Sequence, residues 1–241
     1  MSIQVILLDI EGAITPIEFV KQTLFPYAKA HMGDLVAANR AALNEELTQL
    51  AAEHSADPAY QESLDLASPA SITAYLHFLI DIDYRKSAPL KSLEGEVWQA
   101  GYETGALRAP VFPDVRPAFE RWSNAGMRIA IYSSGSVLAQ KLLFRYTDQG
   151  DLSPYLSGYF DAKTGPKLAS MSYGRISGEL KTRPSEILFI SDTTEELDAA
   201  NRCGLNVLLS VRPGNASLAE PTNHRAITSF AVVLENLSLA V

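Results

Sequence analysis

The chain has 241 residues, of which 47% are hydrophobic and 20% are charged, and its formal net charge is -8. This composition excludes a disordered chain and suits one α/β domain, or a core domain with a smaller inserted one. The negative charge argues against nucleic acid as a partner, and a single cysteine excludes an intramolecular disulfide, so we expect a reducing compartment.

The chain begins with an apolar run, residues 3–8, that ends at Asp9. Its β-rich side chains show little polar alternation, which predicts a strand covered on both faces. The run is too short for a membrane span and follows no basic stretch, so a signal peptide is not expected. We therefore expect a cytoplasmic protein without a membrane partner.

The stretch from residue 16 to residue 105 contains no comparable strand run. Helical patterns occupy residues 34–52, 71–82 and 90–103, and prolines lie between them. The pattern predicts an all-helical domain inserted between the first strand and the rest of the sheet.

Strand and helix patterns alternate in the remainder of the chain. Such alternation is typical of a doubly wound, Rossmann-like parallel sheet. We therefore predict an α/β core of residues 1–15 and 106–241, with a helical cap domain of residues 16–105. The predicted helices are 115–125, 137–146 and 195–203, and the predicted strands are 127–132, 158–160 (the weakest), 186–190 and 205–209.

Carboxylates and hydroxyls follow three of the predicted strands, at the edge where open parallel sheets bind ligands. Asp9 and Glu11 follow the first strand, Ser133 and Ser134 follow another, and Asp192 follows a third. Paired carboxylates can supply a nucleophile and a proton donor, a helix N-terminus with hydroxyls binds anions, and Mg²⁺ prefers oxygen ligands. The sequence thus predicts a site for a metal ion and an anion at this edge.

Each of these motifs also has a purely structural interpretation. Asp9 could only turn its loop, and the serines at residues 133–136 could only cap the following helix. Residues 192–195, Asp-Thr-Thr-Glu, have the form of a capping box. The occurrence of all three motifs at strand ends favours the functional interpretation, and capping by Asp192 would not exclude metal binding.

Further candidates lie near these motifs. Lys167 could neutralise a phosphate and the Asp9 carboxylate, and Lys163 competes for this role. Glu196 could contact a metal ligand rather than the metal itself. Residues 212–215, Arg-Pro-Gly-Asn, follow a predicted strand and suit a plain turn at the same sheet edge.

The motifs occur in a definite order: Asp-x-Glu-Gly at 9–12, Ser-Ser-Gly-Ser at 133–136, Gly-Pro-Lys at 165–167 and Ser-Asp at 191–192. This order resembles the four-part pattern of the haloacid-dehalogenase-like phosphatases. Longer segments are similar to the enolase-phosphatase family of methionine salvage, and the similarity covers nearly the whole chain. These segments are residues 5–12, 19–21, 24–27, 83–87, 90–91, 98–102, 131–144, 159–161 and 196–200.

The resemblance implies a role for each residue of the site. Asp9 would be the nucleophile and a magnesium ligand. Glu11 would be the general acid and base, and its backbone carbonyl would bind the metal. Asp192 would complete the site for one Mg²⁺ per monomer. The phosphate would be bound by Ser133, Ser134 and Lys167.

By the same resemblance, the substrate would be a small phosphorylated diketone, 2,3-diketo-5-methylthiopentyl 1-phosphate, and the enzyme would be a monomer. Enolisation would precede transfer of the phosphoryl group to Asp9 and its hydrolysis. The base for enolisation is not evident, since Glu11 and a cap residue are equal candidates. Three other functions stay open: a phosphatase for another phosphomonoester, a metal-free dehalogenase and a binding module without activity.

Two positions depart from the family pattern. Ala13 stands where the family usually has threonine, and Ala169 follows Lys167 where an acid is expected. The lost hydroxyl weakens the expected support of the first loop. Both departures leave inactivity or an altered substrate open.

Overall fold

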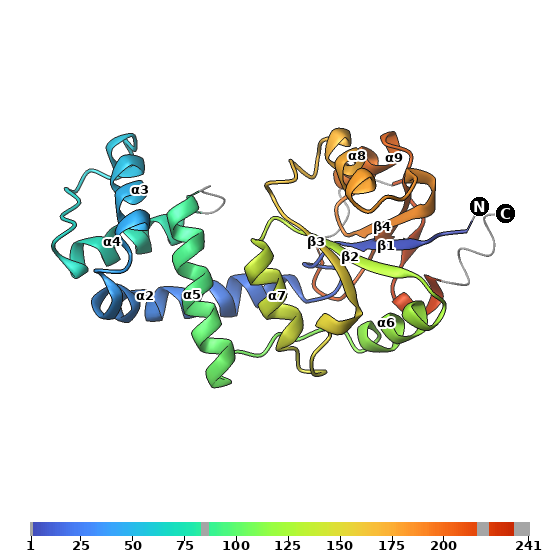
Figure 1. Ribbon diagram of the computed structural model, residues 1–241, viewed down its shortest axis with the longest axis horizontal. Coiled ribbons are helices and arrows are strands. Elements are labelled where there is room, and N and C mark those ends of the chain that lie inside the picture. Colours follow the sequence, from blue (N-terminus) through green and yellow to red (C-terminus); the bar gives the residue numbers. More distant parts are fainter. Residues whose placement is uncertain (1, 83–86, 216–221, 234–241) are drawn as a thin grey trace. The chain divides into compact units, whose positions relative to one another are not determined.

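The computed structural model describes residues 2–82, 87–215 and 222–233. The chain forms two compact units, one of Met1–Phe19 with Arg108–Val241 and the other of Val20–Leu107. The first unit contains the sheet and the second is helical (Figure 1). The predicted fold class, an α/β core with an inserted helical segment, is confirmed. The predicted boundaries, after residues 15 and 105, lie a few residues before the observed ones.

The sheet contains six strands among the described residues, in the order β3-β2-β1-β4-β5-β6, and every neighbouring pair is parallel. The chain order reverses between β1 and β4, where Leu8 pairs with Ile190, and ligands bind at such a switch point. The five predicted strands are confirmed, whereas β6 was not expected. The strands are β1 (Val5–Leu8), β2 (Arg128–Tyr132), β3 (Leu156–Phe160), β4 (Ile187–Ser191), β5 (Asn206–Ser210) and β6 (Ala226–Ile227).

The central strands are buried because their residues are apolar on both faces. All four residues of β1 are completely buried. Figure 1 shows α8 (Ser170–Glu179) and α9 (Thr194–Arg202) on one side of the sheet and α6 (Val115–Asn124) on the other. On the α8 and α9 side, Leu7 and Phe189 share a core with Tyr173 and Leu197. The sheet edge that carries the site is therefore held between two packed layers.

The helices of the first unit agree with the sequence except at one place. The predicted helices correspond to α6, α7 (Val137–Arg145) and α9, while α8 was not predicted. Its sequence, Ser-Met-Ser-Tyr-Gly-Arg-Ile-Ser-Gly-Glu, contains glycine and serine, which are weak helix formers, so packing rather than propensity decides. The short elements of this unit are α1 (Ile17–Phe19), η2 (Ser153–Tyr155), η3 (Pro184–Glu186) and η4 (Phe230–Val232).

One helix predicted in the second unit is wrong. Residues 34–52 do not form a single helix, because the chain turns between α2 and α3. Arg40 holds this turn by donating from Nη1 to the Ala67 carbonyl at 2.6 Å, a contact between distant parts of the chain that local periodicity cannot show. The elements are η1 (Val20–Leu24, a π-helical turn), α2 (Phe25–Asn39), α3 (Asn44–Ser55), α4 (Pro69–Asp81) and α5 (Ala88–Thr104).

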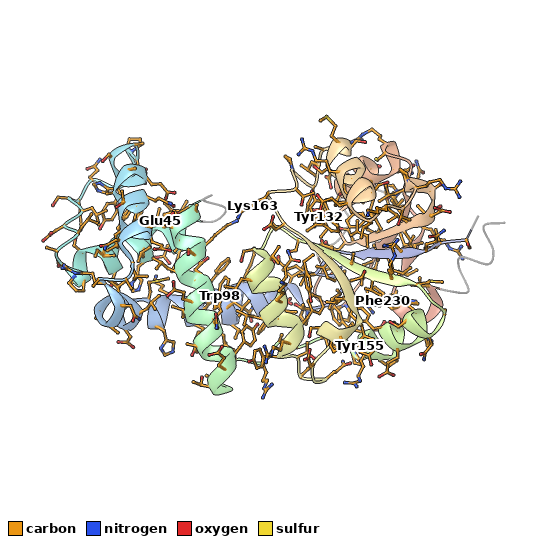
Figure 2. All side chains as sticks on the ribbon, in the orientation of Figure 1. Glu45, Trp98, Tyr132, Tyr155, Lys163 and Phe230 are labelled. Carbon is orange, nitrogen blue, oxygen red and sulfur yellow. The ribbon has the colours of Figure 1, made fainter. Side chains whose placement is uncertain are left out.

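Helix α5 packs closely on the segment that begins this unit. The indole N–H of Trp98 donates to the Leu24 carbonyl at 2.9 Å (Figure 2). A Cβ on Gly101 would lie 2.7 Å from the ring of Tyr27, so glycine lets the two helices approach. In the part of the chain that the structure describes, no helix is both long and apolar enough to cross a bilayer.

Candidate active site

Asp9 is the first residue after β1, at the switch point of the sheet. Its backbone N–H donates to the Ile190 carbonyl at 2.9 Å, which extends the pairing with β4. Its carboxylate accepts from the Ile10 N–H at 2.8 Å and from the Ser191 hydroxyl at 3.2 Å, and it lies 2.7 Å from the Lys167 ammonium. The carboxylate is thus fixed at the C-terminal edge of the sheet.

Lys167 joins two carboxylates. Its Nζ lies 2.7 Å from Asp9 Oδ1 and 2.6 Å from Glu196 Oε2, and all three side chains are largely buried. Burial disfavours the charged ammonium, but the two negative charges outweigh it, so the pKa of Lys167 lies above its ordinary value. Lys163 is exposed. Of the two candidate lysines, Lys167 is therefore the one whose contacts with Asp9 and Glu196 the structure shows.

Glu196 supplies the acidic partner of Lys167 that the sequence lacks at Ala169. It reaches the site from the first turn of α9 and also accepts from the Ser191 hydroxyl at 2.9 Å. Burial raises the pKa of Glu196 to about 7, and the charge of Asp9 acts in the same direction. The sequence places Ser191 in the Ser-Asp motif that follows a predicted strand, but it predicts no role for the Ser191 hydroxyl.

Asp192 follows β4 and lies against the loop that follows β1. A Cβ on Gly12 would lie only 2.2 Å from Asp192 Oδ2, so there is no room for a side chain. Gly12 also has φ +70, a backbone conformation that favours glycine. Burial raises the pKa of Asp192 to about 6, and the negative charge of Asp9 is the next cause. The structure therefore brings Asp9 and Asp192 together, as the sequence predicts for a metal site.

The arrangement fits Mg²⁺ better than a metal that needs many protein ligands. Asp9, Asp192 and Glu196 place three carboxylates near one ammonium, Lys167. Burial is the main cause of the raised pKa of Asp192, and the negative charge of Asp9 adds to it. Within residues 2–82, 87–215 and 222–233, no group of three His, Cys, Asp or Glu side chains could hold a metal. Two carboxylates and water are a usual set for Mg²⁺. Asp9, Asp192 and the Glu11 carbonyl are the groups that would hold it.

The serine loop, residues 133–136, connects β2 to α7 next to β1. Ser133 is buried, and Ser134 is exposed at the sheet edge. Gln140 holds the loop by donating to the carbonyls of Gly135 at 2.8 Å and Phe160 at 2.9 Å. Ser136 caps α7, since its hydroxyl accepts from the Ala139 N–H. Capping thus belongs to Ser136, whereas the Ser133 hydroxyl accepts from the Gly135 N–H at 3.3 Å within the loop.

The capping-box interpretation of residues 192–195 is wrong. The N-cap of α9 is Thr193, whose side chain accepts no capping hydrogen bond. The Thr193 hydroxyl instead donates to Asp192 Oδ1 at 3.1 Å. Asp192 Oδ1 therefore contacts the N-cap residue, while Oδ2 lies against the loop after β1.

Glu11 is half-buried on the same loop as Asp9. The loop closes through the Gly12 N–H, which donates to the Thr15 carbonyl at 2.9 Å, and Ala13 is completely buried inside it. One of the segments that resemble the enolase-phosphatase family, residues 83–87, falls mostly outside the described residues, since 83–86 are not described.

Comparison with known proteins agrees with this geometry. A model of haloacid dehalogenase-like hydrolases matches residues 3–204. An enolase-phosphatase E1 of Synechococcus elongatus is 49% identical over 90% of this chain and 92% of its own length. An enolase-phosphatase E1 of Drosophila mojavensis is 42% identical over 98% of this chain and 97% of its own length.

A solved structure shows the same fold over the whole molecule. The UTR4 protein of Saccharomyces cerevisiae superposes with a TM-score of 0.79 and is 35% identical, over 96% of this chain and 100% of that one. The strand-end motifs, the geometry and these relatives agree. The chain belongs to the haloacid dehalogenase-like hydrolases and, within them, to the enolase-phosphatase E1 family.

Proposed function

We propose that the chain is a magnesium-dependent enolase-phosphatase. It converts 2,3-diketo-5-methylthiopentyl 1-phosphate and water into the acireductone 1,2-dihydroxy-3-keto-5-methylthiopentene and phosphate. The E1 relatives support this proposal by their name, which states both activities. The observation that carries it is the Asp9 carboxylate at the switch point, held by Lys167 at 2.7 Å and Ser191 at 3.2 Å.

Asp9 is the nucleophile of the phosphatase step. Its carboxylate oxygen forms a bond to phosphorus while the bond between phosphorus and the enol oxygen breaks. Lys167 neutralises charge on the phosphate, and Ser133 and Ser134 bind its oxygens. Positioning and charge neutralisation dominate phosphoryl transfer, which suits a carboxylate already fixed by three donors.

Glu11 moves the protons of this step. It gives a proton to the leaving enol oxygen and then takes one from the water that attacks the aspartyl-phosphate, which regenerates Asp9 and releases phosphate. Its place two residues beyond Asp9, half-buried on the same loop, supports this role.

Enolisation comes first and needs a base. A proton leaves the carbon next to a carbonyl of the diketone, and Glu11 or a residue of Val20–Leu107 takes it. When bound by Asp9, Asp192 and the Glu11 carbonyl, one Mg²⁺ supplies positive charge to the oxygens of the substrate.

The remaining parts of the proposal concern the whole protein. Val20–Leu107 serves as the cap domain that excludes water and selects the methylthio chain. The enzyme acts as a monomer in the cytoplasm and uses no nucleic acid or membrane partner.

A substrate panel tests the proposal. The purified chain with Mg²⁺ should release phosphate from the diketone phosphate and form acireductone, and should act far more slowly on sugar phosphates and phosphoserine. Phosphate release from other esters without acireductone would remove the narrower function. Full activity in EDTA would contradict the magnesium dependence and favour a metal-free mechanism.

A further inference from the structure

The loop after β5, residues 211–215, lies beside the loop that carries Asp9. The sequence suggests only a plain turn here, and the backbone agrees: the Asn215 N–H donates to the Arg212 carbonyl at 3.1 Å, and Gly214 has φ +88. Proline and then glycine at the two central positions suit this turn. The turn brings Asn215 back towards the sheet edge.

Arg212 anchors this turn in the protein interior. Its guanidinium lies 4.8 Å from the ring centroid of Phe112 and 4.4 Å from that of Phe230, which Figure 2 labels. Its Nη1 lies 2.9 Å from Asp114, and its Nε donates to the Ala13 carbonyl at 3.2 Å. The position of the turn is thus tied to the loop after β1, where Ala13 brings no hydroxyl of its own.

Asn215 continues this connection to Gly12. Its Nδ2 donates to the Gly12 carbonyl at 3.0 Å and to the Ser210 carbonyl at 3.1 Å. Only the amide nitrogen can donate to two carbonyls, so the orientation of the side chain is fixed. The amide oxygen must therefore point away from both carbonyls.

This amide oxygen is buried and has no hydrogen-bond partner among the described residues. It lies 3.0 Å from the position that a Cβ on Gly12 would occupy, and Asp192 Oδ2 lies 2.2 Å from the same position. Both oxygens thus lie against Gly12, so close to it that no side chain fits there. A buried acceptor without a partner is costly, so it needs a donor that the described residues do not supply.

We propose that Asn215 is a positioning residue of the magnesium site, whose amide oxygen accepts a hydrogen bond from a water molecule bound to Mg²⁺. Mg²⁺ keeps several waters when it binds to proteins, and those waters can only donate. The amide nitrogen sets the turn at Gly12 and aims the oxygen. This inference rests on the proposed magnesium site but not on the identity of the phosphorylated substrate.

Magnesium binding without substrate tests the proposal. Isothermal titration of the metal-free chain with Mg²⁺ gives the affinity directly, and contacts behind a metal's ligands typically change it 10- to 100-fold. We expect Asn215→Ala to weaken Mg²⁺ binding by about tenfold or more. The matched control is Asn206→Ala at the other end of β5, where an exposed asparagine donates to the Ser185 carbonyl, and it should leave the affinity unchanged.

Asn215→Asp separates the two parts of the side chain. It loses the amide nitrogen, as Asn215→Ala does, but it keeps an oxygen and adds negative charge, so its Mg²⁺ affinity should stay well above that of Asn215→Ala. Equal loss in both folded variants, or wild-type affinity in Asn215→Ala, would overturn the proposal. If the wild-type chain binds no Mg²⁺, the magnesium site itself fails and this inference fails with it.

Discussion

Two groups of buried charges in the sheet unit are built in opposite ways. At the edge beyond β5, Arg212 faces Asp114, which also accepts from the Ser229 hydroxyl and the Phe230 N–H. At the switch point, one ammonium, Lys167, meets two carboxylates beside a third, Asp192. We call the first the balanced pair and the second the acidic cluster.

The pKa directions of the two groups show what the difference means. Burial would raise the pKa of Asp114, but the Phe230 N–H and the Arg212 charge outweigh it, so this pKa lies below its ordinary value. In the acidic cluster, burial and Asp9 raise the pKa of Asp192 to about 6. In the balanced pair one positive and one negative charge offset each other within the protein, although Arg212 Nη2 has no hydrogen-bond partner among the described residues. The acidic cluster has an excess of negative charge and is suited to an added cation, as functional sites often are.

The largest effect should come from Asp9, the proposed nucleophile. Asp9→Asn keeps the shape of the side chain but removes its charge, and we expect kcat for phosphate release to fall by at least about 10⁴-fold. The matched control, Asp34→Asn, changes a highly exposed aspartate of α2. Steady-state kinetics checks both variants. An Asp9→Asn enzyme with wild-type kcat would show that the acidic cluster is not catalytic.

Breaking the balanced pair should cost stability. Arg212→Met leaves Asp114 partly buried without its counter-ion, so we expect the free energy of unfolding to fall by about 3–5 kcal/mol. Urea denaturation measures it. The control Arg183→Met removes an arginine whose side chain is 73% exposed, so it should cost far less. Similar losses in the two variants would mean that burial does not distinguish these ion pairs.

Lys167→Met should affect the rate more than the stability. Loss of the charge that meets the phosphate lowers kcat by about 10²- to 10³-fold. The unfolding free energy should fall less than in Arg212→Met, because Glu196, with its pKa raised to about 7, can take up a proton. Lys163→Met is the matched control and should change kcat by less than about threefold. The assignment fails if Lys163→Met proves the more damaging variant.

A smaller effect should appear with pH, since solvent partly screens Asp192. Its pKa is raised from 3.8 to about 6, so between these values the folded chain binds more protons than the unfolded chain, and stability falls as pH rises. Asp114, with its lowered pKa, acts in the opposite sense, because its stabilisation is lost as pH falls.

Urea denaturation in EDTA across this pH range provides the measurement. Asp192→Asn should flatten the decline of the unfolding free energy with rising pH. When EDTA is left out, added Mg²⁺ should stabilise the wild-type chain most at the upper end of this pH range, where Asp192 is charged. Identical profiles for wild type and variant would show that Asp192 does not contribute to the decline.

The sequence allows much of the acidic cluster to be predicted, because the central strands are recognisable from their sequence. Each central strand is an uninterrupted apolar run, so the polar residue that ends it is visible, and parallel strands bring Asp9 and Asp192 to one edge. Glu196 was expected only as a possible neighbour of the metal ligands. Its 2.6 Å contact with Lys167 depends on how α9 packs, which local sequence does not determine.

Other features were hidden because tertiary contacts produce them. The turn between α2 and α3 depends on a distant carbonyl that binds Arg40. Strand β6 has two residues and leaves almost no periodicity to detect. Residues 212–215 have the composition of any turn, and only the neighbouring Gly12 carbonyl gives Asn215 its special place.

The hydrogen bond between Ser191 and Asp9 joins residues that are 182 positions apart in the chain. Contacts of such long separation are among the slowest to form in folding. Asp9 is synthesised early, but Ser191 can reach it only after β4 has paired with β1. Catalytic turnover would therefore report completed assembly of the sheet, and a shortened chain ending before β4 would carry Asp9 and Lys167 but neither Ser191 nor Glu196.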